Sequence, residues 1–130
     1  MAVNPMIALV VEREWDVKES LKKKLERRGY EVSTAENAEE ALNLCTVLDV
    51  DLVITASDLP EMSGFALIER ITEGRKDLSV SSIILLERNE TAQNALRNRM
   101  RSLSFINKPV LEESLTKCLG TELRSTEMEG

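Results

Sequence analysis

The chain has 130 residues, of which 42% are hydrophobic and 31% are charged, and its formal net charge is −6. This length and balance are typical of one globular domain and leave no room for a second domain. No apolar run approaches the roughly 20 residues of a membrane span, and the N-terminus lacks the features of a signal peptide, so we expect a cytoplasmic protein. The acidic balance argues against binding of nucleic acid by this domain.

Apolar runs and amphipathic segments alternate along the first half of the chain. Ile7–Val11 is a continuous apolar run that ends in charge, which predicts a buried parallel strand. Residues 16–28 place apolar side chains at helical spacing, whereas residues 30–33 alternate in polarity and predict an outer strand. Asn37 and Glu40 then form a capping pair that opens a second helix.

The second half of the chain continues this alternation. The remaining strands are predicted at residues 52–55, 82–86 and 103–106, and the remaining helices after residue 64, at residues 92–100 and at residues 111–119. Five strands that alternate with five helices predict an α/β fold, in which a parallel sheet is covered on both faces. We assign residues 1–119 to this domain and residues 120–130 to a polar tail or the start of a linker, which leaves an effector beyond the last residue as an open alternative.

Two short motifs follow predicted strands. The loop Leu59-Pro60-Glu61-Met62-Ser63-Gly64 comes after the third strand, and Lys108-Pro109 comes after the fifth. This layout resembles the CheY-like receiver domain of response regulators, whose corresponding loop reads Met-Pro-x-Met-Asp-Gly, and the resemblance extends over residues 6–119. It implies a doubly wound, flavodoxin-like sheet of order 2-1-3-4-5. It also implies a role in two-component (phosphorelay) signal transduction, and not in enzyme catalysis.

The resemblance also implies where a functional site would lie. In that strand order the carboxyl ends of strands one, three, four and five meet at one crevice. A phosphate-accepting receiver has an acidic pair, an acceptor aspartate, a hydroxyl residue and a lysine at these ends. Glu12 matches the first acid and Lys108 matches the lysine, while Phe105 matches the aromatic residue that moves on activation.

Three positions depart from the family pattern. Arg13 replaces the second acid, Ala56 replaces the acceptor aspartate and Glu87 replaces the hydroxyl residue. Alanine has no nucleophile, so no phosphoaspartate can form at position 56. We therefore expect a degenerate (pseudo-) receiver without catalytic residues.

These departures also bear on the metal. A cation at position 13 opposes Mg²⁺, so we expect Mg²⁺ to be absent or weakly bound, with Glu12 and Asp58 as the remnant of a metal site. Glu12 and Glu87 could instead form ion pairs with Arg13 and Lys108, which would replace both the metal and the phosphate. The other interpretation is that all these groups are solvated charges at strand ends.

Two alternatives keep phosphate acceptance. Ala56 could be an engineered replacement of an aspartate, or Asp58 could be the acceptor. A single engineered change at position 56 would have left the other pocket residues as they are in the family. Position 13 is instead arginine and not an acid, and position 87 is glutamate and not a hydroxyl residue. The degenerate receiver is therefore favoured. An acceptor moved by two residues would also lose its in-line geometry.

Receivers usually signal through the surface made by helix four, strand five and helix five. Here this region carries Arg97, Arg99, Arg101 and Phe105, which could bind an acidic protein partner or a second copy of the chain. A solvated polar face is the alternative reading of these arginines. Trp15, just after the first strand, is expected to pack at the start of its helix.

Overall fold

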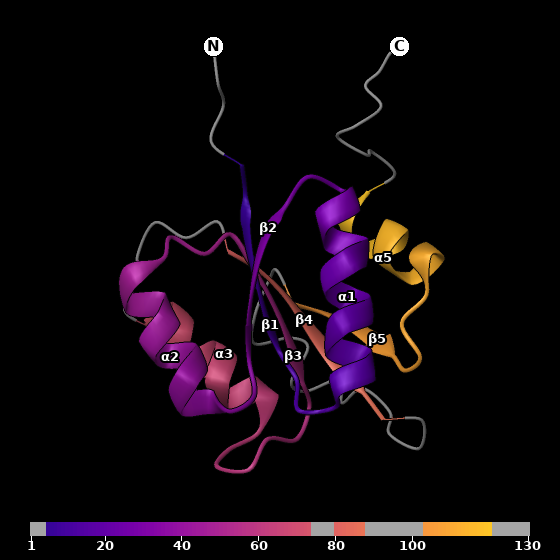
Figure 1. Ribbon diagram of the computed structural model, residues 1–130. Coiled ribbons are helices and arrows are strands. Elements are labelled where there is room, and N and C mark those ends of the chain that lie inside the picture. Colours follow the sequence, from indigo (N-terminus) through magenta and orange to yellow (C-terminus); the bar gives the residue numbers. More distant parts are fainter. Residues whose placement is uncertain (1–4, 74–79, 88–102, 121–130) are drawn as a thin grey trace.

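The computed structural model describes residues 5–73, 80–87 and 103–120. Its five strands form one parallel sheet in the order β2-β1-β3-β4-β5 (Figure 1). The strands are β1 (Ile7–Val11), β2 (Glu31–Ala35), β3 (Leu52–Ala56), β4 (Ser81–Leu86) and β5 (Leu103–Asn107). The predicted fold class and strand order are confirmed.

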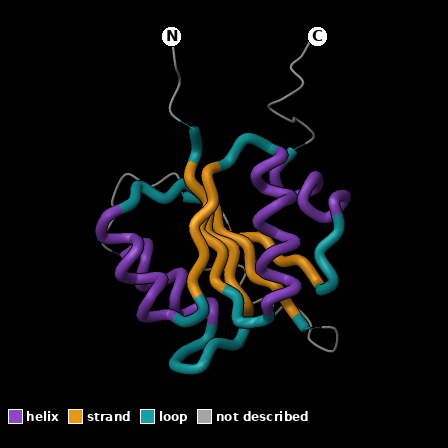
Figure 2. Tube along the Cα trace, viewed as in Figure 1, coloured by secondary structure: helices purple, strands orange, loops and turns teal. Residues whose placement is uncertain are grey.

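Helices cover both faces of the sheet. Figure 2 shows helices on either side of the strands. One face carries α1 (Trp15–Arg27) and α5 (Glu112–Leu119), and the other carries α2 (Ala38–Val47) and α3 (Gly64–Glu73). None of the described helices is both long and apolar enough to cross a membrane. The predicted helix at residues 92–100, the arginines at 97, 99 and 101, and the tail at 121–130 lie outside the described residues.

The strands separate two hydrophobic cores because their side chains alternate between the faces. Leu9 and Val53 point to the α2–α3 side, while Val10 and Ile54 point to the α1–α5 side, and all four are fully buried. Burial on both faces explains why these strands read as continuous apolar runs. It also leaves the strand ends as the places where charged residues can reach water.

The second helix begins as the sequence predicts. The Asn37 Oδ1 atom accepts a hydrogen bond of 2.8 Å from the Glu40 amide, and Glu40 Oε1 accepts one of 2.7 Å from the Glu36 amide. The first bond satisfies an amide of the first helical turn that has no partner within the helix, and the second holds the residue just before the cap. Trp15 differs from expectation: it begins α1 but is 66% exposed, because α1 turns Lys18, Leu21 and Leu25 toward the protein instead.

A buried arginine joins the two helices of one face. Arg28 follows α1, and only 4% of its side chain is exposed. Its guanidinium donates hydrogen bonds to the carbonyl oxygen of Gly120, the carboxylate of Glu112 and the hydroxyl of Thr116, at 3.1, 3.2 and 3.0 Å. The exposed Arg27 reaches the same carboxylate at 2.8 Å. Glu112 therefore links α5 to two consecutive arginines, of which only Arg28 is enclosed.

We expect Arg28→Met to lower the free energy of unfolding by about 2–3 kcal/mol, because it leaves partners on α5 without a donor. Arg27→Met is the matched control. It removes an arginine from the same carboxylate but from an exposed position, and should cost no more than about 0.5 kcal/mol. Urea unfolding followed by circular dichroism measures both values. Equal losses in the two variants would contradict a special role for the enclosed guanidinium.

The same carboxylate should make stability depend on pH. The hydrogen bond from Arg27 lowers the pKa of Glu112, and the bond from Arg28 and both arginine charges act in the same direction, against burial, which raises it. Because the pKa of Glu112 is lower in the folded than in the unfolded chain, its carboxylate stabilises the fold at pH values above the unfolded-state pKa. This contribution is lost as the pH falls through the lowered pKa of the folded state. Between pH ~6 and ~3, wild type should therefore lose more stability than Glu112→Gln. Parallel pH profiles of the two proteins would contradict this.

Candidate functional site

The sheet register brings four strand ends to one edge. Val11 pairs with Thr55, Ala56 with Leu85, and Leu86 with Asn107. The residues that follow these pairs are therefore neighbours, although they are far apart in the sequence. Glu12 leaves β1, Glu87 leaves β4 and Lys108 leaves β5, all at the edge where Ala56 ends β3.

Lys108 lies at the centre of a group of carboxylates. Its Nζ atom is 3.0 Å from Glu12 Oε1, 3.0 Å from Glu87 Oε2 and 3.4 Å from Glu14 Oε1. Only 10% of the lysine side chain is exposed. We call these four residues (Glu12, Glu14, Glu87 and Lys108) the Lys108 cluster. With all groups ionised it holds three negative charges and one positive charge.

Glu12 is the most enclosed member of the Lys108 cluster, with 3% of its side chain exposed. Its Oε2 atom accepts a hydrogen bond of 3.0 Å from the Glu14 amide, which fixes the carboxylate. Its Oε1 atom is buried and has no well-directed hydrogen bond, although the ammonium of Lys108 is 3.0 Å away. The contact at this oxygen is therefore mainly electrostatic.

The cluster keeps Lys108 protonated. Burial by itself lowers the pKa of Lys108, but the hydrogen bond with Glu87, the close contact with Glu12 and the charges of both carboxylates outweigh burial, so the pKa is raised above its ordinary value. The lysine is therefore a permanent cation at neutral pH. Its contribution to stability persists until the pH rises through this raised pKa.

Arg13 is not part of the cluster. Its side chain is exposed, and among the described residues none forms a hydrogen bond or ion pair with it. It lies on the side of Glu36, whose pKa is lowered by the hydrogen bond from Lys18 and further by the charge of Arg13. Successive side chains point in opposite directions as the chain leaves a strand, so Glu12 and Arg13 separate. The expected ion pairs between Arg13 and the carboxylates are therefore not formed. The position beside Glu12 and Lys108 is taken by Glu14, which adds a negative charge to the cluster.

Ala56 lies in an apolar environment. It is 6% exposed and belongs to the hydrophobic core on the α2–α3 side, together with Val11 and Leu59. Ser57, the next residue, is half-buried, and Asp58 is exposed. Phe105 is half-buried on β5 and packs against the same core as Ala56. Asp58 and Phe105 are thus near this edge but outside the Lys108 cluster.

The loop after β3 is held by backbone hydrogen bonds at both ends. The Ser57 amide donates to Leu85 of β4 at 3.0 Å, and the Gly64 amide donates to Ser57 at 2.9 Å. Asp58 and Ser63 form an antiparallel bridge between them. A β-carbon on Gly64 would collide with the carbonyl oxygen of Ala56, so only glycine permits this close approach.

Glu61 ties the same loop to another helix. Its Oε1 atom accepts a hydrogen bond of 3.2 Å from the Ala38 amide, at the start of α2. A carboxylate at a helix N-terminus is stabilised by the helix dipole and satisfies an unpaired amide. The sequence offered no sign of this contact, because the two residues are 23 positions apart. Glu14, in contrast, follows the first strand beside Glu12, so the sequence does place it at this edge.

The oxygens of this edge are a poor fit to Mg²⁺. Three carboxylate oxygens surround the Lys108 nitrogen at 3.0–3.4 Å, which are the distances of contacts with an ammonium group. A Mg²⁺ ion at the same place would require its oxygens at about 2.0–2.1 Å. Within the described residues, no group of three His, Cys, Asp or Glu side chains is arranged to hold a metal ion. Asp58, the other suggested metal remnant, makes its bridge with Ser63 and is not in the cluster.

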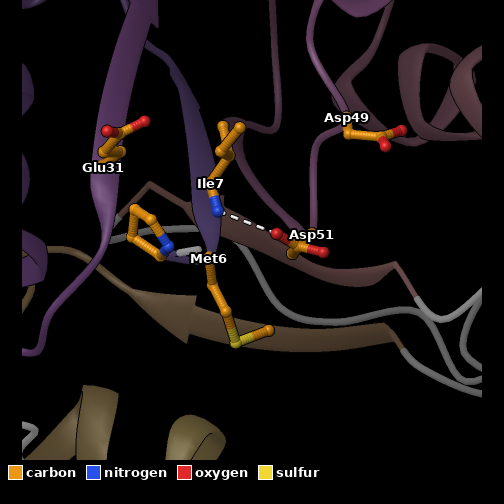
Figure 3. A pocket seen from close by; sticks show the side chains of 6 residues that line it. Met6, Ile7, Glu31, Asp49 and Asp51 are labelled. Carbon is orange, nitrogen blue, oxygen red and sulfur yellow. Dashed lines mark hydrogen bonds between the residues drawn. The ribbon is translucent and has the colours of Figure 1, made fainter. Parts of the chain in front are cut away.

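A hollow of about 460 Å³ lies at the opposite edge of the sheet. Figure 3 shows Met6, Ile7, Glu31, Asp49 and Asp51 around it, with the Asp51 carboxylate accepting a hydrogen bond of 2.8 Å from the Ile7 amide. This bond fixes the start of β1. Because the hollow lies at the amino ends of β1 and β2, the length of the strands separates it from the Lys108 cluster.

Comparison with known proteins agrees with this geometry. The family model described as the response regulator receiver domain matches residues 8–119. An "uncharacterized 14.6 kDa protein in sodA1 3'region" of Leptolyngbya boryana is 36% identical over 107 residues, which cover 81% of this chain and 80% of that protein.

Two further relatives extend the comparison. The "probable transcriptional regulator ycf27" of Cyanophora paradoxa is 27% identical over 98% of this chain, which spans about half (52%) of its length. The structure of chemotaxis protein CheY4 of Vibrio cholerae superposes with a TM-score of 0.77 at 23% identity, covering 89% of this chain and 97% of that one. At this identity the structural match shows the fold.

We expect Gly64→Ala to lower the free energy of unfolding by about 3 kcal/mol or more, because the added methyl group displaces the backbone at the end of β3. The control is Gly120→Ala, where φ is +94° but nothing lies within 4 Å of the added carbon. It should cost only the backbone strain of about 1–2 kcal/mol. Denaturant unfolding measures both. A smaller loss for Gly64→Ala than for its control would show that the loop adapts.

Proposed function

Because the chain belongs to the family of response regulator receiver domains, we propose that it is a pseudo-receiver: a two-component signalling domain that acts through protein contacts without accepting a phosphoryl group. One observation carries this proposal. The strand that ends at the functional edge of the fold terminates in Ala56, whose methyl group packs in the hydrophobic core. A phosphoryl acceptor needs a nucleophilic oxygen at this point, and a methyl group has none.

Neighbouring side chains are poorly placed to replace the missing carboxylate. Asp58 lies two residues beyond the end of β3, is exposed and forms a bridge with Ser63. A nucleophile must stand in line with the bond that breaks, and a shift of two residues along the chain disturbs that alignment. Asp58 therefore remains the weaker candidate acceptor.

The Lys108 cluster supports the proposal independently of Ala56. In a phosphate-accepting receiver the lysine binds the phosphoryl oxygens, but here its ammonium already contacts three carboxylates. Glu87 adds a negative charge where the family has a hydroxyl donor, so an incoming phosphoryl group would be repelled. Arg13 and Glu87 also argue against an engineered change at Ala56. A single substitution at position 56 would not account for the departures from the family pattern at positions 13 and 87.

Signalling without phosphorylation requires a partner. We propose that an acidic protein surface, or a second copy of the chain, binds the region of Arg97, Arg99, Arg101 and Phe105. Phe105 is half-buried and packs against the α2–α3 core, which leaves part of its side chain exposed. Such a domain would act in the cytoplasm, without Mg²⁺ and without nucleic acid as its own ligand.

The test is incubation with acetyl phosphate and MgCl₂, followed by intact mass spectrometry. We expect no increase by the mass of one phosphoryl group, because no carboxylate ends β3. A receiver that retains its aspartate, treated in the same way, shows that the reagent is active. A phosphoryl adduct on wild type would contradict the proposal, and its loss in Asp58→Asn would then identify Asp58 as the acceptor.

A further inference from the structure

We propose that α1 is a docking surface for a second copy of this chain, and that the α1 helices of the two copies pack antiparallel about a two-fold axis. This contact goes beyond the proposed function, because α1 (Trp15–Arg27) is separate from the region of Arg97, Arg99, Arg101 and Phe105. The basis of the contact is the distribution of charge along the exposed side of the helix.

Charges of opposite sign occupy the two halves of α1. On its outer side the first half carries Asp16 and Glu19, and Asp16 is exposed while Glu19 is partly exposed. The second half carries one acid, Glu26, among four cations: Lys22, Lys23, Lys24 and Arg27. Such a helix is complementary to itself. When a second copy is turned end to end, the acidic half of each helix faces the basic half of the other.

The spacing of these charges fits an antiparallel pair of helices. Residues three or four apart share one side of a helix, so positions 16, 19, 23 and 27 form one stripe. This stripe lies away from the buried side of α1, which carries Lys18, Leu21 and Leu25. A two-fold axis midway between Glu19 and Lys23 pairs each glutamate with the lysine of the other copy. It also places Asp16 opposite the basic last turn.

The helix dipole explains only the outermost of these charges. It favours acids in the first turn and bases in the last turn, and its effect falls off beyond them. Asp16 and Arg27 lie in those turns, whereas Glu19 and Lys23 lie between them. Within the described part of the chain, neither Glu19 nor Lys23 forms an ion pair. Both are therefore available to a second copy.

An exposed aromatic residue lies at one end of the stripe. Trp15 begins α1 and is 66% exposed, although tryptophan is a residue type enriched at protein interfaces. In the antiparallel pair the first turn of each helix lies beside the last turn of the other, which would cover Trp15. One helix from each copy buries less than the ~1,200–2,000 Å² of a stable interface, so we expect a weak, reversible dimer.

The experiment measures self-association of the whole chain by sedimentation equilibrium and follows tryptophan fluorescence at the same protein concentrations. Trp15 is the single tryptophan of the sequence, so its emission reports on this end of α1. Wild type should form dimers as its concentration rises, and the emission should shift to the blue because the indole ring leaves water. Added NaCl should weaken both changes, since it screens the ion pairs between the helices.

Charge reversal identifies the pairs. Glu19→Lys and Lys23→Glu should each weaken dimerisation ~tenfold or more, because each places like charges opposite one another twice. An equimolar mixture of the two variants should dimerise as wild type does, since every reversed charge then meets its opposite on the other copy. The matched control is Glu39→Lys, which makes the same change of charge at an exposed position on α2, and it should dimerise like wild type. Circular dichroism confirms that each variant is folded.

Three results would overturn the inference: a wild type that stays monomeric at every concentration, dimers that survive both charge reversals, or dimers that form without a change in the emission of Trp15. Failure of the two variants to dimerise in the mixture would overturn the antiparallel pairing of Glu19 with Lys23. None of these results involves acetyl phosphate. A phosphoryl adduct on wild type would instead overturn the proposed function, so the two failures can be told apart.

Discussion

The burial of both faces of a parallel sheet is the constraint on which the other features depend. Every central strand is lined by apolar side chains on both sides, so charged residues are excluded from the strands and gather where the strands end. All strands run in the same direction, and their carboxyl ends therefore share one edge. The Lys108 cluster is a consequence of this arrangement, since its members leave β1, β4 and β5 at that edge.

The cluster in turn couples strands that no local interaction would join. Lys108 connects the end of β5 to the end of β4 through Glu87, and to the end of β1 through Glu12. Partly enclosed ion pairs contribute little net stability, because desolvation offsets much of their attraction, but removal of one partner is costly. Their effect here is to select one arrangement of the strand ends.

The loop after β3 is fixed by a different set of contacts. The close approach of Gly64 to Ala56 and the bond from Glu61 to the start of α2 hold it against the sheet on one side and a helix on the other. Both contacts involve residues of the loop motif itself. The motif therefore retains its structural role although the strand before it ends in alanine.

Local pattern was sufficient to predict much of this protein. Apolar runs located the strands, the Asn37–Glu40 pair located the start of α2, and the loop and Lys-Pro motifs gave the family, the strand order and the alanine at the end of β3. These features depend on residues that are close together in the sequence, or on motifs that follow one another along the chain in the order typical of the family. Strand ends differed by one or two residues, because backbone pairing, and not polarity, sets the last residue of a strand.

Only the tertiary structure decided which charges meet. Glu12, Arg13 and Glu14 are consecutive, yet Glu12 and Glu14 face Lys108 while Arg13 faces the opposite side. Arg28 and Glu61 also found partners on distant elements. The direction of a long side chain depends on the path of its loop and on neighbours brought there by folding. The sequence therefore determined the edge of the sheet at which charged residues gather. The three-dimensional structure determined that three carboxylates there share one lysine, whose single positive charge balances only one of their three negative charges.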